Sequence, residues 1–396
     1  MLHFNHYMPT RLIFGPGELK QLGTHEALSR GKKAMIVIGE SGIMLKNGFL
    51  AKTQGFLSEH GIQSLVFDGI KPNPESDSIV EAAAICKGKN IDLVVGLGGG
   101  SSLDAAKAIA LMAANDGELW DYVASGTGKN KKPEFPALPI IAIPTTAGTG
   151  SEVTPSAVIT KSGSQEKIGI RHESMYPLLA VVDPDLMHSM PPYLTACTGM
   201  DAFFHAVESY LSTVRSPTAD LLALETIHLI CHYLPQAVAD GDDTEARIAL
   251  AWASTAAGMS LSQAVAISQH SMEHALSGFY PQLPHGAGLS MLSNAYFSFL
   301  VEKDVERIED LAMAMADALE VEIPEDQLME SFIPMLEELV RAVGLAEENL
   351  SDYGMKPEDI PALADTAMDA MSHLFTISPV EMTRDDVISI FEAAYS

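Results

Sequence analysis

The chain has 396 residues, a length that favours more than one domain. Of these residues 47% are hydrophobic and 19% charged, a composition typical of a globular protein. Its formal net charge of −28 argues against binding to nucleic acid or to an anionic membrane. No apolar run reaches the ~18 residues of a transmembrane helix, and the N-terminus does not resemble a secretory signal. The cysteines, Cys86, Cys197 and Cys231, are scattered. We therefore expect a reducing cytoplasm, and any metal site must use histidines and carboxylates.

Short apolar runs alternate with helical stretches in the first half of the chain. Residues 78–86 (SIVEAAAIC) have the pattern of a helix, and residues 91–95 (IDLVV) that of a buried strand. This alternation predicts a parallel sheet in a doubly wound, Rossmann-like α/β domain. Further strands are predicted at residues 33–38, 64–67, 139–143 and 178–182.

Helical periodicity without strand-like alternation follows after about residue 190. We therefore predict two domains, an α/β domain at residues 1–190 and an all-α domain at residues 191–396. Helices of the second domain are expected at residues 219–233, 245–266, 304–319 and 326–343.

A glycine-rich segment, residues 96–107 (GLGGGSSLDAAK), directly follows the strand predicted at 91–95. Glycines let the backbone turn sharply and approach a ligand closely, and the N-terminus of the next helix favours a phosphate. We expect Ser101 to cap that helix, with Asp104 in a capping-box-like position. Because the strict GxGxxG pattern is not met, the segment alone favours a pyrophosphate site and a tight structural turn about equally.

A second loop, residues 144–154 (PTTAGTGSEVT), follows the strand predicted at 139–143. Its hydroxyl groups could donate to a ribose, a phosphate or a nicotinamide amide. By composition alone, an ordinary threonine- and glycine-rich loop is the favoured interpretation.

Two pairs of polar residues lie one helical turn apart in otherwise apolar segments. Asp201 and His205 form the first pair, and His270 and His274 the second, so each pair shares a helix face. His285 follows a proline and precedes a glycine, which predicts a helix start. Buried imidazoles need partners, and four histidines with an aspartate favour a metal site over isolated hydrogen bonds. Such ligands suit Fe²⁺, Zn²⁺, Ni²⁺ or Co²⁺ better than Mg²⁺ or Ca²⁺.

Together these segments resemble the iron-containing (group III) alcohol dehydrogenase family. The resemblance covers most of the chain and rests on four motifs in a fixed order: GGGSSLDAAK, PTTAGTGSEVT, GMDAFFHAVE and HSMEHALSGFYPQLPHG. It implies a dinucleotide-binding N-terminal domain, a helical metal-binding C-terminal domain and catalysis in the cleft between them. It also implies a homodimer, and it agrees with a cytoplasmic location.

The resemblance also assigns roles to residues by matching position. It implies one divalent ion, Fe²⁺ with Zn²⁺ as the alternative, and it makes His274 an additional histidine near the nicotinamide. The residues that match the metal ligands are Asp201, His205, His270 and His285. The residues that match cofactor contacts are Gly98, Gly99, Ser101, Asp104, Thr145, Thr146 and Lys167.

The choice between NAD and NADP is expected to depend on Gly39, Glu40 and Ser41, which follow the strand predicted at 33–38. In dinucleotide sites a carboxylate after this strand binds the ribose 2′-OH and repels a 2′-phosphate. Gly39 stands where many NAD-using relatives have an aspartate, which favours NADP(H). Glu40 could replace that carboxylate, and Ser41 is a weaker phosphate donor than a charged group. The sequence therefore favours NADP(H) only slightly and leaves use of both cofactors open.

The favoured function is reversible hydride transfer between an alcohol and NAD(P)⁺, with an aldehyde or ketone as the product. The metal would lower the pKa of the alcohol, and His274 would relay its proton. The alternatives with this architecture are a polyol (glycerol-type) dehydrogenase, a dehydroquinate-synthase-like lyase and a metal-free reductase. The complete ligand set argues against the metal-free enzyme, and the few basic residues near the motifs argue against the lyase. A non-catalytic binding protein would need a lost motif, and none is seen.

Overall fold

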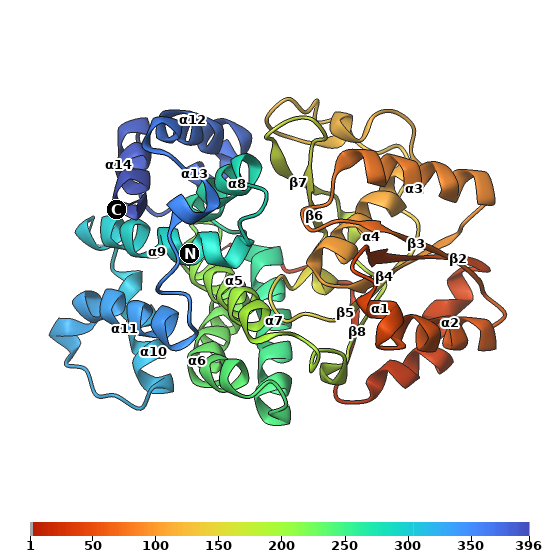
Figure 1. The fold of residues 1–396 in the computed structure, drawn as a ribbon, viewed down its shortest axis with the longest axis horizontal. Helices are drawn as coiled ribbons and strands as arrows, with labels where there is room; N and C mark the ends of the chain where they lie inside the picture. Colours follow the sequence, from red (N-terminus) through yellow and green to blue (C-terminus); the bar gives the residue numbers. More distant parts are fainter. Residues whose placement is uncertain (1–2, 304, 396) are drawn as a thin grey trace. The chain divides into compact units, whose positions relative to one another are not determined.

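The computed structural model describes residues 3–303 and 305–395, which form two compact units (Figure 1). The α/β unit comprises residues 8–146 and 150–189. The helical unit comprises the described residues of 1–7, 147–149 and 190–396. The fold class predicted from the sequence is confirmed. Residue 304, the first residue of the helix predicted at 304–319, lies outside the described residues.

Within the described residues, the α/β unit contains a six-stranded sheet in the order β1-β8-β5-β4-β2-β3, and every strand pair in it is parallel. Five of these strands coincide with the predicted ones. The first strand, β1, was not predicted, because it has only four residues and none of them is fully buried. The strands of this sheet are β1 (Arg11–Phe14), β2 (Lys33–Gly39), β3 (Gln63–Ile70), β4 (Leu93–Gly98), β5 (Ile140–Pro144) and β8 (Leu179–Val182). A separate antiparallel hairpin, also not predicted, joins β6 (Ser156–Thr160) to β7 (Lys167–Arg171).

Helices cover both faces of this sheet. On one face, Ile36 of β2 and Val95 of β4 enter a hydrophobic core that includes Leu57. On the other face, β4 approaches its following helix closely because Gly96 has no side chain, and a Cβ there would lie 3.0 Å from Leu103 Cδ2. The helices of this unit are α1 (Ile43–Lys46), α2 (Phe49–Glu59), α3 (Ser76–Lys89) and α4 (Gly100–Ala114).

The start of α4 differs from the prediction. The helix begins at Gly100 with Gly99 as its N-cap, and none of the described side chains caps it. The expectation that Ser101 is the cap is therefore wrong. Gly98 has a φ of +149°, a conformation that favours glycine, and the glycines let the helix begin before the first serine. Among the described residues, α4 thus begins without a side-chain cap.

The helical unit is organised around α5 (Pro192–Leu211), whose residues 199–211 are all buried. The predicted helices at 219–233, 245–266, 304–319 and 326–343 correspond to α6, α7, α10 and α11. No helix in the described residues is long and apolar enough to cross a membrane. The remaining helices of this unit are α6 (Pro217–Ala239), α7 (Thr244–Ala264), α8 (Ser268–Phe279), α9 (His285–Glu302), α10 (Arg307–Ala318), α11 (Leu328–Ala342), α12 (Ile360–Ala370), α13 (Ser372–Thr376) and α14 (Arg384–Tyr395).

Candidate active site

Three helices of the helical unit supply the polar cluster that the sequence singled out. Asp201 and His205 lie one turn apart on α5, and His270 and His274 one turn apart on α8. His285 is the first residue of α9 and follows Pro284, as its neighbours predicted. All of these except His285 are buried, and His285 keeps 24% of its side chain exposed.

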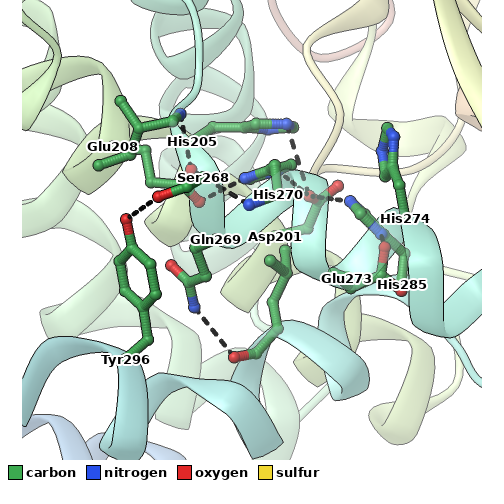
Figure 2. Close-up of polar contacts among 12 residues, drawn as sticks. Asp201, His205, Glu208, Ser268, Gln269, His270, Glu273, His274, His285 and Tyr296 are labelled. Carbon is green, nitrogen blue, oxygen red and sulfur yellow. Dashed lines mark hydrogen bonds and ion pairs between the residues drawn. The ribbon is translucent and has the colours of Figure 1, made fainter. Parts of the chain in front are cut away.

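Three imidazoles surround one oxygen of Asp201 (Figure 2). The Nε2 atoms of His205, His270 and His285 lie 3.6, 3.7 and 3.5 Å from Asp201 Oδ1. The rings of His205 and His270 stack, with centroids 4.6 Å apart. Two of the atoms that face each other, Asp201 Oδ1 and His270 Nε2, are buried and have no hydrogen-bond partner among the described residues. Buried polar atoms of this kind require an explanation.

A divalent ion fits these distances. Two ligands ~2.1 Å from a tetrahedral ion are separated by roughly 3.4 Å, close to the observed separations from Asp201 Oδ1. Those separations are long for hydrogen bonds. Asp201, His270 and His285 lie close enough to one another to share an ion, and His205 adds a nitrogen near Asp201 alone. A second such group is formed by Glu273, His274 and His285. One carboxylate and three imidazoles make a donor set suited to Fe²⁺ or Zn²⁺.

Two buried glutamates contact the Nδ1 atoms of two of these histidines, on the side of the ring away from Asp201. The sequence analysis identified neither of them. Glu208 Oε1 accepts a hydrogen bond from His270 Nδ1, and Glu273 Oε2 accepts one from His285 Nδ1. Neither glutamate is exposed to solvent. A signal for Glu208 was present, because it lies seven residues after Asp201 and so on the same face of α5. Carboxylates that hold the far nitrogen of a ligating imidazole are a common feature of metal sites.

Burial and neighbouring charges lower the pKa values of Asp201 and His205 and raise that of His270. Burial alone would raise the pKa of Asp201, but the surrounding imidazoles outweigh burial and lower it. Burial lowers the pKa of His205 to about 4 despite the adjacent Asp201. Burial would also lower the pKa of His270, but Glu208 outweighs it and raises that pKa to about 10.

His274 occupies a different position from the other three histidines. Its ring centroid lies 5.3 Å from that of His285 and 6.3 Å from that of His270. Its Nδ1 lies 2.9 Å from the sulfur of Met371. A thioether is only a weak acceptor and cannot take up a proton, so any proton transfer by this residue must use Nε2.

The cofactor contacts expected from the sequence gather mainly at the carboxyl ends of strands in the α/β unit. β2 and β4 are neighbours in the sheet, but the chain passes through the outer strand β3 between them. In doubly wound sheets such a change of direction is where nucleotides bind. Gly39 ends β2 and Gly98 ends β4, so both lie at this point. Thr145 follows β5 and donates its N–H to Gly98 O at 3.0 Å.

The glycines at the end of β4 permit close contacts with neighbouring polar side chains. A Cβ on Gly98 would lie 2.6 Å from Ser102 Oγ, and one on Gly99 would lie 3.2 Å from Thr146 Oγ1. Ser101 lies in the first turn of α4. Glycine at these two positions therefore lets the backbone at the end of β4 lie against the side chains of Ser102 and Thr146.

Both carboxylate oxygens of Asp104 accept hydrogen bonds from other residues of this chain. Its Oδ1 accepts from Ser151 Oγ at 2.5 Å and its Oδ2 from the N–H of Val158 at 2.8 Å. These bonds tie α4 to the loop after β5 and to the β6–β7 hairpin. Lys107, fully buried, lies 3.6 Å from Asp104 Oδ1, and burial lowers its pKa to about 8. Lys167 is buried on β7 of the same hairpin.

The segment that we expect to determine the choice of cofactor, residues 39–41, is partly exposed in this structure. Gly39 is partly buried, whereas Glu40 and Ser41 are exposed. A Cβ on Gly39 would make only ordinary contacts, 3.5 Å from Ile70 O and 3.7 Å from Ser102 Oγ. The Cβ of a side chain at residue 39 would therefore fit without a shift of the backbone.

Comparisons with known protein families account for nearly the whole chain. Residues 9–184 match the family model of iron-containing alcohol dehydrogenases, and residues 195–395 match the model of the C-terminal part of the Fe-containing alcohol dehydrogenase family. Alcohol dehydrogenase 4 of Schizosaccharomyces pombe is 37% identical over 392 residues, which cover 98% of this chain and 88% of the yeast protein. The 1,3-propanediol dehydrogenase of Klebsiella pneumoniae is 33% identical, with 99% of each chain covered. The NAD-dependent methanol dehydrogenase of Bacillus methanolicus is 35% identical, with 92% and 93% covered.

Solved structures show the same similarity in three dimensions. An archaeal halo-thermophilic alcohol dehydrogenase from a Red Sea brine pool has a TM-score of 0.92 and 36% identity, with 100% of this chain and 99% of that chain covered. A 1,3-propanediol oxidoreductase has a TM-score of 0.90 and 33% identity, with both chains covered completely.

Proposed function

Because this chain belongs to the iron-containing alcohol dehydrogenase family and interconverts an alcohol with its aldehyde or ketone, we propose that its divalent metal ion is held by four side chains: Asp201, His205, His270 and His285. The observation that supports this most directly is the set of three imidazole nitrogens 3.5–3.7 Å from one buried carboxylate oxygen. When bound, the ion supplies Lewis acidity that stabilises negative charge on the alcohol oxygen. The family's name favours Fe²⁺ over Zn²⁺ as that ion.

His274 is proposed to move the proton of the alcohol. It is buried, it adjoins His285, and its Nδ1 contacts the sulfur of Met371. The proton would therefore be taken up and released at Nε2. An imidazole suits this role because its ordinary pKa lies near neutrality.

The nicotinamide cofactor is proposed to bind at the carboxyl ends of β2, β4 and β5. The first turn of α4 carries no acidic residue and no side-chain cap among the described residues, so its N–H groups can hold the pyrophosphate. The absent side chain of Gly39 leaves room for a 2′-phosphate, and the adjacent Glu40 provides a carboxylate for a ribose hydroxyl. We therefore expect use of both NAD(H) and NADP(H), with a slight preference for NADP(H).

Short primary alcohols are the proposed substrates, because relatives at 33–35% identity are named for 1,3-propanediol and methanol. A panel of methanol, ethanol, 1,3-propanediol and glycerol, assayed with both cofactors, tests this and separates it from a polyol dehydrogenase. The homodimer and the cytoplasmic location that the family resemblance implies stay predictions.

Two substitutions on one helix face test the division of roles. We expect His270→Ala to abolish both metal content and turnover, because it removes a ligand. His274→Ala should retain the metal while kcat falls by about 10²–10⁴, the usual contribution of a positioned acid or base. Metal analysis after anaerobic purification and steady-state kinetics are the measurements. Full metal occupancy in His270→Ala would exclude that residue as a ligand, and metal loss in His274→Ala would make His274 one.

A further inference from the structure

The carboxylate of Glu208 on α5 makes hydrogen bonds both to the N-terminus of α8 and to the imidazole of His270, a proposed metal ligand. Glu208 Oε2 accepts the backbone N–H of Ile267 at 2.8 Å and that of His270 at 3.3 Å. Its other oxygen, Oε1, accepts from the imidazole Nδ1 of His270 (Figure 2). The carboxylate is fully buried, and a negative charge at a helix N-terminus is favourable.

We propose that Glu208 is a positioning residue that fixes the tautomer of His270. A neutral imidazole carries one proton, and only the nitrogen without it can bind a metal. An ionised carboxylate can only accept hydrogen bonds, so the nitrogen beside Glu208 must be protonated. The proton therefore lies on Nδ1, and Nε2 is left bare 3.7 Å from Asp201 Oδ1. The inference rests on the proposed metal site and adds to it a residue outside the ligand set.

The two backbone N–H donors require an oxygen at the Oε2 position of residue 208, so an amide there can orient in only one way. In Glu208→Gln, the single amide oxygen must accept the N–H groups of Ile267 and His270, since the NH₂ group cannot. The NH₂ group then faces His270 Nδ1, which must become an acceptor. The imidazole proton moves to Nε2 and occupies the position of the metal. The variant thus removes one charge and also selects the wrong tautomer, and a wrong tautomer can be far more damaging than a lost charge.

Glu273 provides a matched control on the neighbouring ligand. It is equally buried, and its Oε2 accepts from His285 Nδ1. Its other oxygen accepts from the hydroxyl of Ser277, a group that can donate or accept. In Glu273→Gln, the amide oxygen can stay on His285 while its NH₂ group donates to Ser277. This variant loses the charge but keeps the tautomer.

The experiment measures the Zn²⁺ affinity of the parent chain and of both variants by competition with a chelator at one pH. Loss of an outer carboxylate commonly costs 10–100-fold in metal affinity. We expect a loss of about 100-fold or more in Glu208→Gln and of about tenfold in Glu273→Gln. Equal losses in the two variants would overturn the proposal, because a lost charge alone predicts them. Unchanged affinity in Glu208→Gln would overturn it as well.

A second measurement keeps the proposal testable if Glu208→Gln does not fold, which thermal unfolding of the metal-free proteins would reveal. In the zinc-loaded parent, the ¹⁵N resonances of His270 should show a protonated Nδ1 and a metal-bound Nε2. The reverse assignment would exclude the role of Glu208. A parent chain that binds no Zn²⁺, Fe²⁺ or Co²⁺ would instead disprove the proposed metal site, so the two failures are distinguishable.

Discussion

Gly39 is the residue at which the proposed cofactor preference can be tested most directly. It ends β2 next to the start of α4, where a carboxylate would repel a 2′-phosphate and accept hydrogen bonds from a ribose hydroxyl. A Cβ at residue 39 makes only ordinary contacts, so the first atom of an aspartate side chain fits there. The neighbouring Glu40 donates its backbone N–H to Ile70 O at 2.9 Å, which fixes the chain beside this position.

Gly39→Asp is expected to weaken the use of NADP(H) selectively. A carboxylate ~4 Å from a phosphate repels it by roughly 1–4 kcal/mol, depending on solvent exposure, so kcat/KM for NADP(H) should fall by about tenfold or more. The value for NAD(H) should be maintained or rise. The measurement is kcat/KM with both cofactors in parent and variant. A parent that strongly prefers NAD(H), and loses this preference in Glu40→Ser, would show that Glu40 is the discriminating carboxylate.

Among the elements, α5 is the helix against which the candidate site is assembled. A Cβ on Gly286 of α9 would lie 1.8 Å from the carbonyl oxygen of Cys197, and one on Gly148 would lie 2.6 Å from that of Thr198. Both contacts fall within one turn before Asp201. Glycine at these positions therefore lets the start of α9 and residues 147–149 touch the backbone of α5, and the first of these contacts brings His285 to Asp201.

Gly286→Ala should therefore displace His285 from Asp201. The added methyl group cannot be accommodated against a backbone carbonyl, so α9 must move away from α5. We expect metal affinity to fall at least tenfold and the apparent Tm to decrease, as measured by chelator competition and thermal unfolding. Gly55→Ala on α2 is the control, because a Cβ there meets nothing within 4 Å and alanine is favoured within a helix by about 0.5–1 kcal/mol. Unchanged metal affinity in Gly286→Ala would show that α9 can adjust without moving the ligand.

At the scale of the whole molecule, the excess of 52 acidic over 24 basic residues matters most. The resulting charge of −28 favours solubility but destabilises the folded state through self-repulsion. Salt screens this repulsion, since the Debye length falls from about 30 Å at 0.01 M to about 10 Å at 0.1 M.

The apparent Tm should consequently rise by several degrees as NaCl increases from about 0.01 M to 0.3 M, and change less above that range. Thermal unfolding at a series of NaCl and KCl concentrations is the measurement, with sucrose as an uncharged control. A Tm that responds only above 1 M salt would point to a general salt effect on hydrophobic burial and would exclude self-repulsion as the cause.

The sequence by itself determined what depends on local periodicity and motif spacing. Strand–glycine–helix order, uninterrupted helical periodicity and residue pairs four apart are short-range patterns, and they predicted the fold class, five strands and the helix faces of Asp201 and His270. The cap of α4 was mispredicted at Ser101 because serine is the usual cap, whereas the preceding glycines permit an earlier start.

Only the tertiary structure decided which side chains meet across helices. The three Nε2 atoms around Asp201 come from α5, α8 and α9, and their distances follow from backbone contacts such as that of Gly286 with Cys197. The contact of Glu208 with His270 spans 62 residues. A carboxylate within an apolar helix has the same sequence signature whether it faces a histidine or another partner. Its role therefore depends on which helix packs against it, and that is set by the packing of the whole unit.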